Sequence, residues 1–222
     1  MPTATITADP FDFECDPSTT ALLMIDFQRD FVMPNGFGEA LGNDVSLLRS
    51  TIEPAGNILA AARQIGMLVV HTREGHSPDL ADCPPAKLTR GGTTFIGTEG
   101  SMGRILIRGE EGHDIIPELY PIDGEVIIDK PGKGAFYATD LELILRNKAI
   151  KSLIFCGVTT EVCVNTTMRE ANDRGYECLV LEDCVGSYFP EFQTAALDMI
   201  KAQGAIVGWV SNSVDAIAAL TP

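Results

Sequence analysis

The chain has 222 residues, 45% of them hydrophobic, which is enough for one sizeable α/β core. Its formal charge of −15 argues against binding to nucleic acid or to an anionic membrane, because phosphate recognition depends on clustered Lys and Arg. No apolar run approaches the roughly 18 residues of a membrane span, and the N-terminus does not resemble a signal peptide. We therefore expect a soluble, cytoplasmic protein.

Short apolar runs alternate with helical patterns along the first part of the chain. Residues 20–25 predict a buried strand, residues 45–66 a helix that Pro54 kinks or divides, and residues 67–71 a second strand. Residues 72–124 are irregular and rich in Gly, Pro and charge. Since ordinary connections are far shorter, this segment is interpreted as a functional loop, a lid or an arm between subunits.

The second half of the chain alternates strand and helix more regularly. Strands are predicted at 125–129, 152–158, 177–183 and 205–210, and helices at 138–148, 160–175, 190–204 and 213–221. The strands are continuous apolar runs, as expected when both faces of a sheet are covered. The pattern predicts an α/β fold: a single doubly wound domain over residues 19–222, with a mostly parallel six-stranded sheet between two layers of helices. Residues 1–18 are expected to form an N-terminal extension.

Six cysteines occur in the chain, and none forms a C-x-x-C pair. A cytosolic chain of this size does not need disulfides, so we predict neither a disulfide framework nor structural zinc. Cys156, Cys178 and Cys184 lie in or beside predicted strands and are interpreted as structural. His71 and His76 are close together in sequence, but their spacing is a weak metal signal. We expect no metal and no cofactor.

Three ionisable residues follow predicted strands, although they are far apart in sequence. Asp26 directly follows the first strand, Lys130 the third, and Cys163 comes a few residues after the fourth. In doubly wound sheets, ligands bind outside the carboxyl ends of the strands, so these residues can share one rim. Each also has a structural alternative: a turn or cap residue for Asp26, a solvated charge for Lys130, and a small core residue for Cys163.

The three residue types suit nucleophilic catalysis. A cysteine attacks as its thiolate, and a position near a helix N-terminus is expected to lower the pKa of the Cys163 thiol. Asp26 can accept the thiol proton and return it to a leaving amine, while Lys130 holds that carboxylate in position. The backbone N–H groups of Thr159 and Cys163 are candidates for an oxyanion hole, and Gly157 allows the sharp backbone turn that such a site needs.

Three segments carry a resemblance to a known family. They read "LLMIDFQRDF", "IIDKPGKGAF" and "GVTTEVCV" in chain order. They resemble the aspartate strand, the lysine segment and the G-[VI]-[TA]-T-x-x-C-V nucleophile turn of the isochorismatase-like cysteine hydrolases. The resemblance covers about residues 18–220 and implies the three-layer, Rossmann-type fold of that family.

The family resemblance also assigns roles to residues. It implies a catalytic triad of Asp26, Lys130 and Cys163, and a cis peptide bond between Val158 and Thr159 that directs two backbone amides at the oxyanion. It implies a homotetramer as well. Nicotinamidases of the family carry an Asp-x-His-x-His type metal site, and the sequence lacks this cluster, which disfavours a metal-dependent nicotinamidase. The nucleophilic cysteine favours hydrolysis of a C–N bond over isochorismatase activity.

Within the family, the sequence is most similar to biuret and triuret hydrolases. The similarity is carried by segments such as "HTREGHSPDLADCP", "IIDKPGKGAFYATDLEL" and "TTMREANDRGYECLVLEDC". It implies that Lys133 and Gln203 bind the oxygens and amide groups of a linear ureide; the alternatives are a surface charge and a helix-end residue. Phe31 and Tyr188 are further candidates for the substrate pocket, although Tyr188 can equally serve in loop packing.

The activity implied by this resemblance is hydrolysis of a terminal C–N bond of triuret or biuret through a cysteine thioester, with release of ammonia. The choice between two and three urea units stays open, because the likeness weakens at residues 32–44 and 186–192. Other substrates within the family are ureidoacrylate, N-carbamoylsarcosine and nicotinamide. A non-catalytic scaffold is the alternative from a different functional class.

Overall fold

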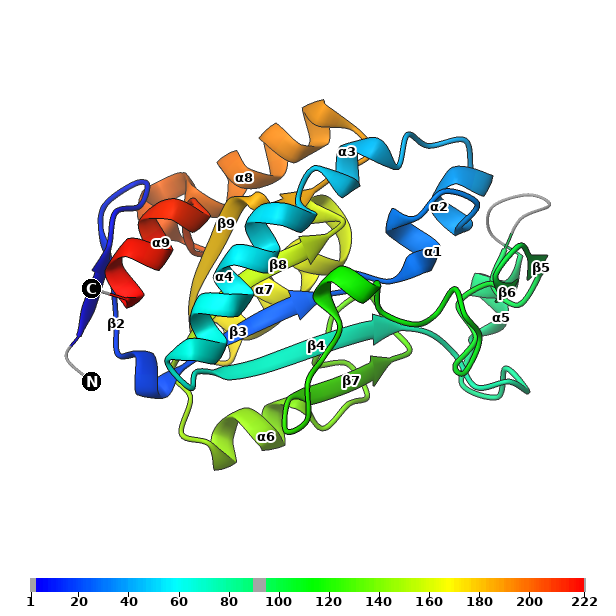
Figure 1. The fold of residues 1–222 in the computed structure, drawn as a ribbon, viewed down its shortest axis with the longest axis horizontal. Helices are drawn as coiled ribbons and strands as arrows, with labels where there is room; N and C mark the ends of the chain where they lie inside the picture. Colours follow the sequence, from blue (N-terminus) through cyan, green and yellow to red (C-terminus); the bar gives the residue numbers. More distant parts are fainter. Residues whose placement is uncertain (1–2, 90–94, 222) are drawn as a thin grey trace.

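A computed structural model describes residues 3–89 and 95–221 of the chain. Its central sheet consists of six strands: β3 (Thr20–Ile25), β4 (Leu68–Glu74), β7 (Val126–Lys130), β8 (Ser152–Val158), β9 (Glu177–Gly186) and β10 (Trp209–Ser211). They lie in the order β10-β9-β8-β3-β4-β7 (Figure 1). All pairings in this sheet are parallel, so the predicted doubly wound sheet is confirmed.

Helices cover both faces of the sheet, because alternate residues of each strand point to opposite faces. In β3, Leu22 and Met24 belong to one hydrophobic core, whereas Leu23 and Ile25 belong to the other. The first core is covered by α4 (Ile52–Gln64) and α9 (Ser213–Leu220). The second is covered by α6 (Leu141–Asn147), α7 (Asn165–Asp173) and α8 (Pro190–Ala205).

Several predicted elements have different bounds in the structure, and two of them differ in a way that the local sequence explains. The helix expected at 45–66 is divided into α3 (Ser46–Arg49) and α4, and Pro54 lies in the first turn of α4, where a backbone N–H has no helical partner. The last strand is shorter than the predicted 205–210. The chain leaves helical geometry at Ala202–Gly204 and reaches the sheet only at β10.

The residues before β3 form a two-stranded antiparallel hairpin, with strands β1 (Ala4–Ile6) and β2 (Phe13–Cys15), followed by the 3-10 turn η1 (Pro17–Thr19). Ile6 and Phe13 are buried in the first core. Between the two strands, the N–H of Asp9 donates to the Val210 carbonyl at 2.8 Å, and the Val210 N–H donates back to Asp9 at 3.1 Å. The hairpin therefore covers the β10 edge of the sheet.

The long segment after β4 folds over the carboxyl end of the sheet, next to the loop that follows β3 (Figure 1). The N–H of Asp30 in that loop donates to the Gly112 carbonyl at 2.8 Å, and its carboxylate accepts the Leu106 N–H at 3.0 Å. Gln28 donates to the carbonyls of Glu74 and His113, both at 2.9 Å. These bonds fix the surroundings of the strand ends; a role as a lid or subunit arm stays a prediction.

The remaining short elements all lie in these two loops. They are α1 (Arg29–Val32), α2 (Phe37–Ala40), α5 (Pro85–Leu88), β5 (Glu99–Gly100), β6 (Gly103–Arg104) and η2 (Pro117–Leu119). Among the helices described here, none is both long and apolar enough to span a membrane.

Candidate active site

The structure brings together the three ionisable residues that the sequence places at strand ends. Asp26 follows β3, Lys130 ends β7, and Cys163 lies in a π-helical turn, η3 (Thr160–Val164), between β8 and α7. Lys130 Nζ lies 2.7 Å from Asp26 Oδ2, and Cys163 Sγ lies within 4.8 Å of the Asp26 carboxylate. All three side chains are buried.

Lys130 is surrounded by polar groups that keep its buried side chain charged. Its ammonium donates to the carbonyls of Gly132 and Lys133, both at 3.0 Å, and pairs with Asp26. Burial lowers the pKa of Lys130, but the negative charges of Asp26 and Glu74 act against burial, and the net shift raises that pKa above its ordinary value. Lys130 therefore remains an ammonium at neutral pH.

Asp26 is fixed from the neighbouring strand. The Thr72 hydroxyl donates to Asp26 Oδ1 at 2.5 Å, and the Asp26 N–H donates to the Thr72 carbonyl at 3.2 Å. The backbone of Asp26 has a φ of +52°, a conformation that Asp tolerates better than most residues. With Thr72 on one oxygen and Lys130 on the other, the carboxylate is held in one orientation.

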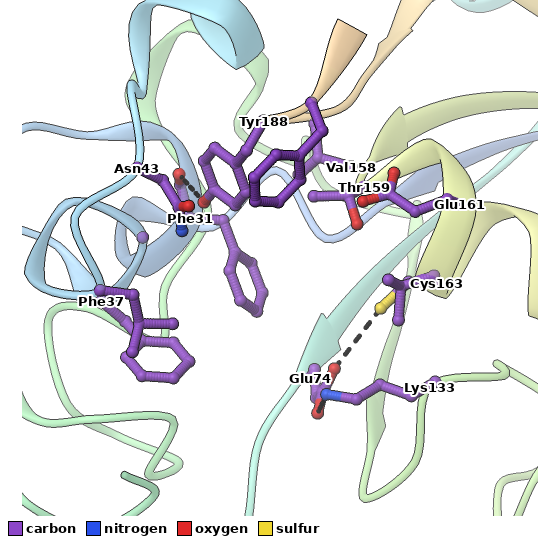
Figure 2. Close-up of a pocket in the computed structure, with 14 residues that line it drawn as sticks. Phe31, Phe37, Asn43, Glu74, Lys133, Val158, Thr159, Glu161, Cys163 and Tyr188 are labelled. Carbon is purple, nitrogen blue, oxygen red and sulfur yellow. Dashed lines mark hydrogen bonds and ion pairs between the residues drawn. The ribbon is translucent and has the colours of Figure 1, made fainter. Parts of the chain in front are cut away.

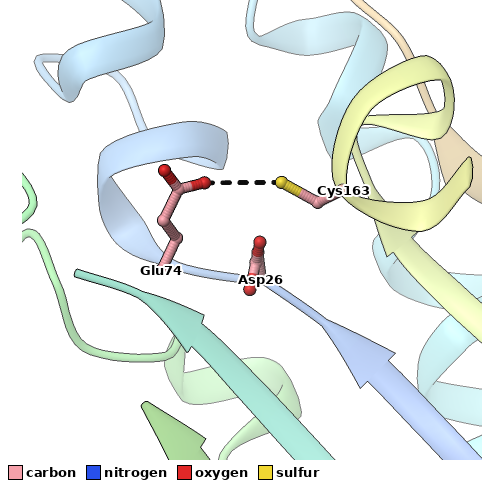
Figure 3. Close-up of side chains that lie close together, drawn as sticks. All are labelled: Asp26, Glu74 and Cys163. Atoms are coloured by element: carbon pink, nitrogen blue, oxygen red, sulfur yellow. Dashed lines mark hydrogen bonds between the residues drawn. The ribbon is translucent and has the colours of Figure 1, made fainter. Parts of the chain in front are cut away.

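The sequence analysis missed Glu74, the last residue of β4. Its side chain is fully buried, and Cys163 Sγ donates to Glu74 Oε2 at 3.4 Å (Figure 3). Glu74 Oε1 lies 2.6 Å from Lys133 Nζ, and Oε2 lies 3.8 Å from Lys130 Nζ. Burial raises the pKa of Glu74, but the two lysines outweigh it and lower that pKa. Its position at a strand end is a signal that the sequence could have provided, but the predicted strand stops at His71 and leaves Glu74 in the following loop.

The protonation state of the nucleophile corrects one expectation. We expected the start of the helix to lower the pKa of Cys163, but that pKa is raised well above the ordinary value. Burial is the largest cause; Lys130 opposes it, whereas Asp26 and Glu74 add to it. In the free protein the thiol is therefore protonated and donates to Glu74.

The donor atoms of Asp26, Glu74 and Cys163 are close enough together to suggest a metal-binding group. However, the Lys130 ammonium lies 2.7 Å from one of these carboxylates and 3.8 Å from the other. A protonated lysine thus already occupies the place of a cation between them, and the donor set does not suit a metal ion without the loss of that charge.

The structure gives His71 and His76 separate partners. His71 Nε2 lies 2.9 Å from Glu125, and His76 Nδ1 lies 3.2 Å from Asp82. Each histidine is therefore paired with a different carboxylate, and the two rings do not share one site. The three cysteines interpreted as structural are buried with free thiols: Cys156, Cys178 and Cys184.

A cavity of about 230 Å³ opens onto the thiol of Cys163 (Figure 2). Most of its wall is apolar and comes from Phe31, Phe37, Leu41, Val158, Val162 and Phe189. Its polar groups come from Asn43, Glu74, Lys133, Thr159, Glu161, Cys163 and Tyr188. A second cavity of about 200 Å³ adjoins it and shares Phe37, Leu41 and Lys133.

Three of the four predicted substrate-binding residues line this cavity. They are Phe31, Tyr188 and Lys133, whose side chain is 46% exposed. The Tyr188 hydroxyl donates to the Phe31 carbonyl at 2.6 Å, so its proton is already used in a hydrogen bond within the protein. The pKa of Lys133 is lowered by burial and raised by Glu74, and the net shift is upward. Lys133 is therefore an ammonium at the cavity.

The structure does not bring Gln203 to this cavity. Its side chain is exposed, at the point where α8 ends. Because α8 leads from the carboxyl end of β9 back to the start of β10, its last residues lie near the amino ends of the strands, whereas Cys163 lies at the carboxyl ends. The predicted order of strand, helix and strand already places the end of this helix away from the carboxyl ends of the strands; the role of Gln203 was implied by the family resemblance alone.

The turn that carries Cys163 has two unusual backbone features. The peptide bond between Val158 and Thr159 is cis, as the family resemblance implies. Gly157 has a φ of +137°, and a Cβ there would lie 2.1 Å from the Ile25 carbonyl oxygen, so only glycine fits. Thr159 and Cys163 both line the cavity. The oxyanion role of their N–H groups stays a prediction.

Comparisons with known proteins agree with this architecture. Residues 20–210 match the family model described as the isochorismatase domain. A cysteine hydrolase from Pseudomonas syringae pv. phaseolicola is similar in fold, with a TM-score of 0.79, 24% identity, and coverage of 99% of this chain and 97% of that one.

Two other solved structures are similar as well. An N-carbamoylsarcosine amidase from Thermoplasma acidophilum has a TM-score of 0.68 and 24% identity over 88% of this chain and 96% of that one. A nicotinamidase from Bacillus subtilis has a TM-score of 0.69 and 27% identity over 87% of this chain and 99% of that one. Since the matched domain spans most of the sequence and includes the whole cluster around Cys163, the chain belongs to the isochorismatase family.

Proposed function

We propose that the protein is a cysteine hydrolase that cleaves a terminal C–N bond of a small linear ureide, triuret or biuret, and releases ammonia. The observation that carries this proposal is a thiol that lines a cavity and has two carboxylates and an ammonium packed around it. Two similar structures are named as an N-carbamoylsarcosine amidase and a nicotinamidase, which supports an amide as the bond that is cleaved.

The reaction begins with transfer of the thiol proton. Glu74 holds the neutral thiol in the free protein, and Asp26 is the base that takes the proton when a substrate carbonyl is in place. Sulfur then bonds to the carbonyl carbon, and the π electrons of the C=O bond move to oxygen. The backbone N–H groups of Thr159 and Cys163 stabilise this oxyanion.

The tetrahedral intermediate collapses with cleavage of the C–N bond. The leaving nitrogen takes the proton from Asp26 and departs as ammonia, which leaves a thioester on Cys163. Water, activated by the freed Asp26 carboxylate, attacks the thioester, and the proton returns to sulfur. The products are ammonia and a carboxylated ureide with one nitrogen fewer.

The polar groups of the cavity suit a ureide. Lys133 is a charged donor beside the thiol and can bind a urea carbonyl oxygen, while its own charge is balanced by Glu74. The adjoining second cavity offers room for a further urea unit, which supports triuret as well as biuret. Other amides of the family are the alternative substrates: ureidoacrylate, N-carbamoylsarcosine and nicotinamide. The homotetramer and the cytoplasmic location stay predictions.

Ammonia release from biuret, triuret, ureidoacrylate, N-carbamoylsarcosine and nicotinamide tests this proposal. We expect turnover of biuret or triuret, its loss in Cys163→Ser, and retention of substrate binding by that variant. Cys83→Ser, which changes another buried cysteine, is the matched control and should remain active. Full activity of Cys163→Ser, or turnover of nicotinamide without turnover of any ureide, would refute the proposal.

A further inference from the structure

Glu161 is a polar residue of the cavity to which the reaction above assigns no role. It lies in η3, two residues before Cys163, and lines the same cavity. Figure 2 shows its carboxylate beside Thr159, on the wall formed by the nucleophile turn. Its Oε2 atom is buried and has no hydrogen-bond partner among the described residues. Over the same ranges, no Lys, Arg or His nitrogen lies within ion-pair distance of this carboxylate.

Two neighbouring hydroxyl groups do not serve Glu161, because they donate elsewhere. The Tyr188 hydroxyl donates to the Phe31 carbonyl, and the Thr160 hydroxyl donates to Gln193. Glu161 and Tyr188 line the same cavity, and the charge of Glu161 contributes to raising the Tyr188 pKa, after burial and Asp30. The Glu161 carboxylate therefore lines the cavity, and its Oε2 atom accepts no hydrogen bond from the described residues.

A buried carboxylate oxygen without a donor is costly, because it has lost the hydrogen bonds that water would provide. An N–H group of a ligand in the cavity would give this carboxylate a donor. A carboxylate on the ligand would instead be repelled by Glu161, and by Glu74 across the same cavity. A position in the first helical turn explains why an acid is stable there, but not why its oxygen lacks a partner.

We propose that Glu161 is a specificity-determining residue, which accepts N–H groups from the end of the substrate remote from the scissile bond. It thereby selects ureides that end in an amide over N-carbamoyl acids that end in a carboxylate. This inference rests on the proposed function and narrows it, since ureidoacrylate and N-carbamoylsarcosine both carry a carboxylate.

Two substitutions separate the charge of Glu161 from its ability to accept a hydrogen bond. Glu161→Gln is nearly isosteric and keeps an acceptor oxygen but removes the charge, whereas Glu161→Leu removes both. The substrates are biuret and N-carbamoylglycine, which have similar lengths and differ in their terminal amide or carboxylate. kcat and KM are measured for each by ammonia release. The matched control is Glu191→Leu, which removes an exposed acid from the first turn of α8, outside the cavity.

We expect Glu161→Leu to raise the KM for biuret about tenfold or more with a much smaller change in kcat, the size of one lost hydrogen bond to a charged group. Glu161→Gln should raise this KM less. In both variants the ratio of kcat/KM for biuret to that for N-carbamoylglycine should fall about tenfold or more. Glu191→Leu should change neither the ratio nor Tm.

An unchanged ratio in Glu161→Gln would overturn the inference, and so would an equal fall in kcat for both substrates. If Glu161→Leu does not fold, the near-isosteric Gln variant decides the result alone. Ureide turnover by the wild type with an unchanged ratio in the variants refutes the role of Glu161 but leaves the proposed function intact. A wild type that hydrolyses none of the ureides refutes the proposed function itself, and the selectivity with it.

Discussion

Replacement of Lys130 by Met should destabilise the protein strongly as well as inactivate it. The two side chains have similar lengths, so Lys130→Met preserves most of the packing and removes the charge. The ammonium is fully buried, 2.7 Å from Asp26 and 3.8 Å from Glu74. Without it, Asp26 loses its counter-ion, while Glu74 keeps only Lys133.

Removal of one partner from a buried ion pair costs about 3–5 kcal/mol, because the other charge is left uncompensated in a medium that solvates it poorly. In a domain of this size, 1 kcal/mol corresponds to about 2–4 °C in Tm. The variant should therefore unfold about 6–20 °C below the wild type. Chemical denaturation at neutral pH gives the same loss as a free energy of unfolding.

The double variant Lys130→Met with Asp26→Asn provides the control. It removes both charges of the pair, so it should regain a large part of the lost stability while remaining inactive. A single variant within about 1 kcal/mol of the wild type would refute the reasoning. A double variant less stable than Lys130→Met would also refute it, because the loss would then come from packing and not from an unpaired charge.

Three further predictions test the thiol, the nucleophile turn and the position of Gln203. The rate at which iodoacetamide alkylates Cys163, followed by peptide mass spectrometry, should continue to rise with pH above pH 9.0, because the pKa of the thiol is raised. Glu74→Gln removes a nearby negative charge and should move this rise to lower pH. The same pH profile in the variant and the wild type would contradict the prediction. Gly157→Ala should lower the free energy of unfolding by about 3 kcal/mol, because its Cβ would meet a carbonyl oxygen at 2.1 Å. Gly124→Ala, whose Cβ would meet nothing within 4 Å, should cost only about 1–2 kcal/mol of backbone strain, and equal losses would count against the clash. Gln203→Ala should leave kcat/KM unchanged, because Gln203 does not line the cavity. A tenfold fall in kcat/KM would show that Gln203 does contribute to the site.

The class of sheet and the positions of the main chemical groups could be largely anticipated. Each strand is a continuous apolar run, which is typical of parallel strands covered on both faces, and the helices between them carry their own periodicity. Asp26 and Lys130 stand where such runs end, so the topology alone places them at one rim of the sheet. Cys163 follows from the same argument, with the start of a helix added.

Glu74 and the protonation of the thiol could not be anticipated in this way. β4 extends three residues beyond the predicted end at His71, through Thr72 and Arg73 to Glu74. These residues are not apolar; they belong to the strand because they pair with β7. The raised pKa of Cys163 depends on burial and on the distances to four charged side chains, which lie on β4 and β7 or in the loops after β3 and β7. Both the end of β4 and the pKa of Cys163 depend on contacts with residues that are distant in the chain, and the local sequence does not specify these contacts.

The sequence by itself determined the class of sheet, the family and the three residues at strand ends, because these depend on periodicity and on motifs that are contiguous in the chain. Only the tertiary structure decided that Glu74 holds the thiol, and that Glu161 lines the cavity with an Oε2 atom to which no described residue donates. The physical reason is that the pKa of a thiol and the satisfaction of a buried oxygen depend on distances between segments, and folding brings those segments together from distant parts of the chain.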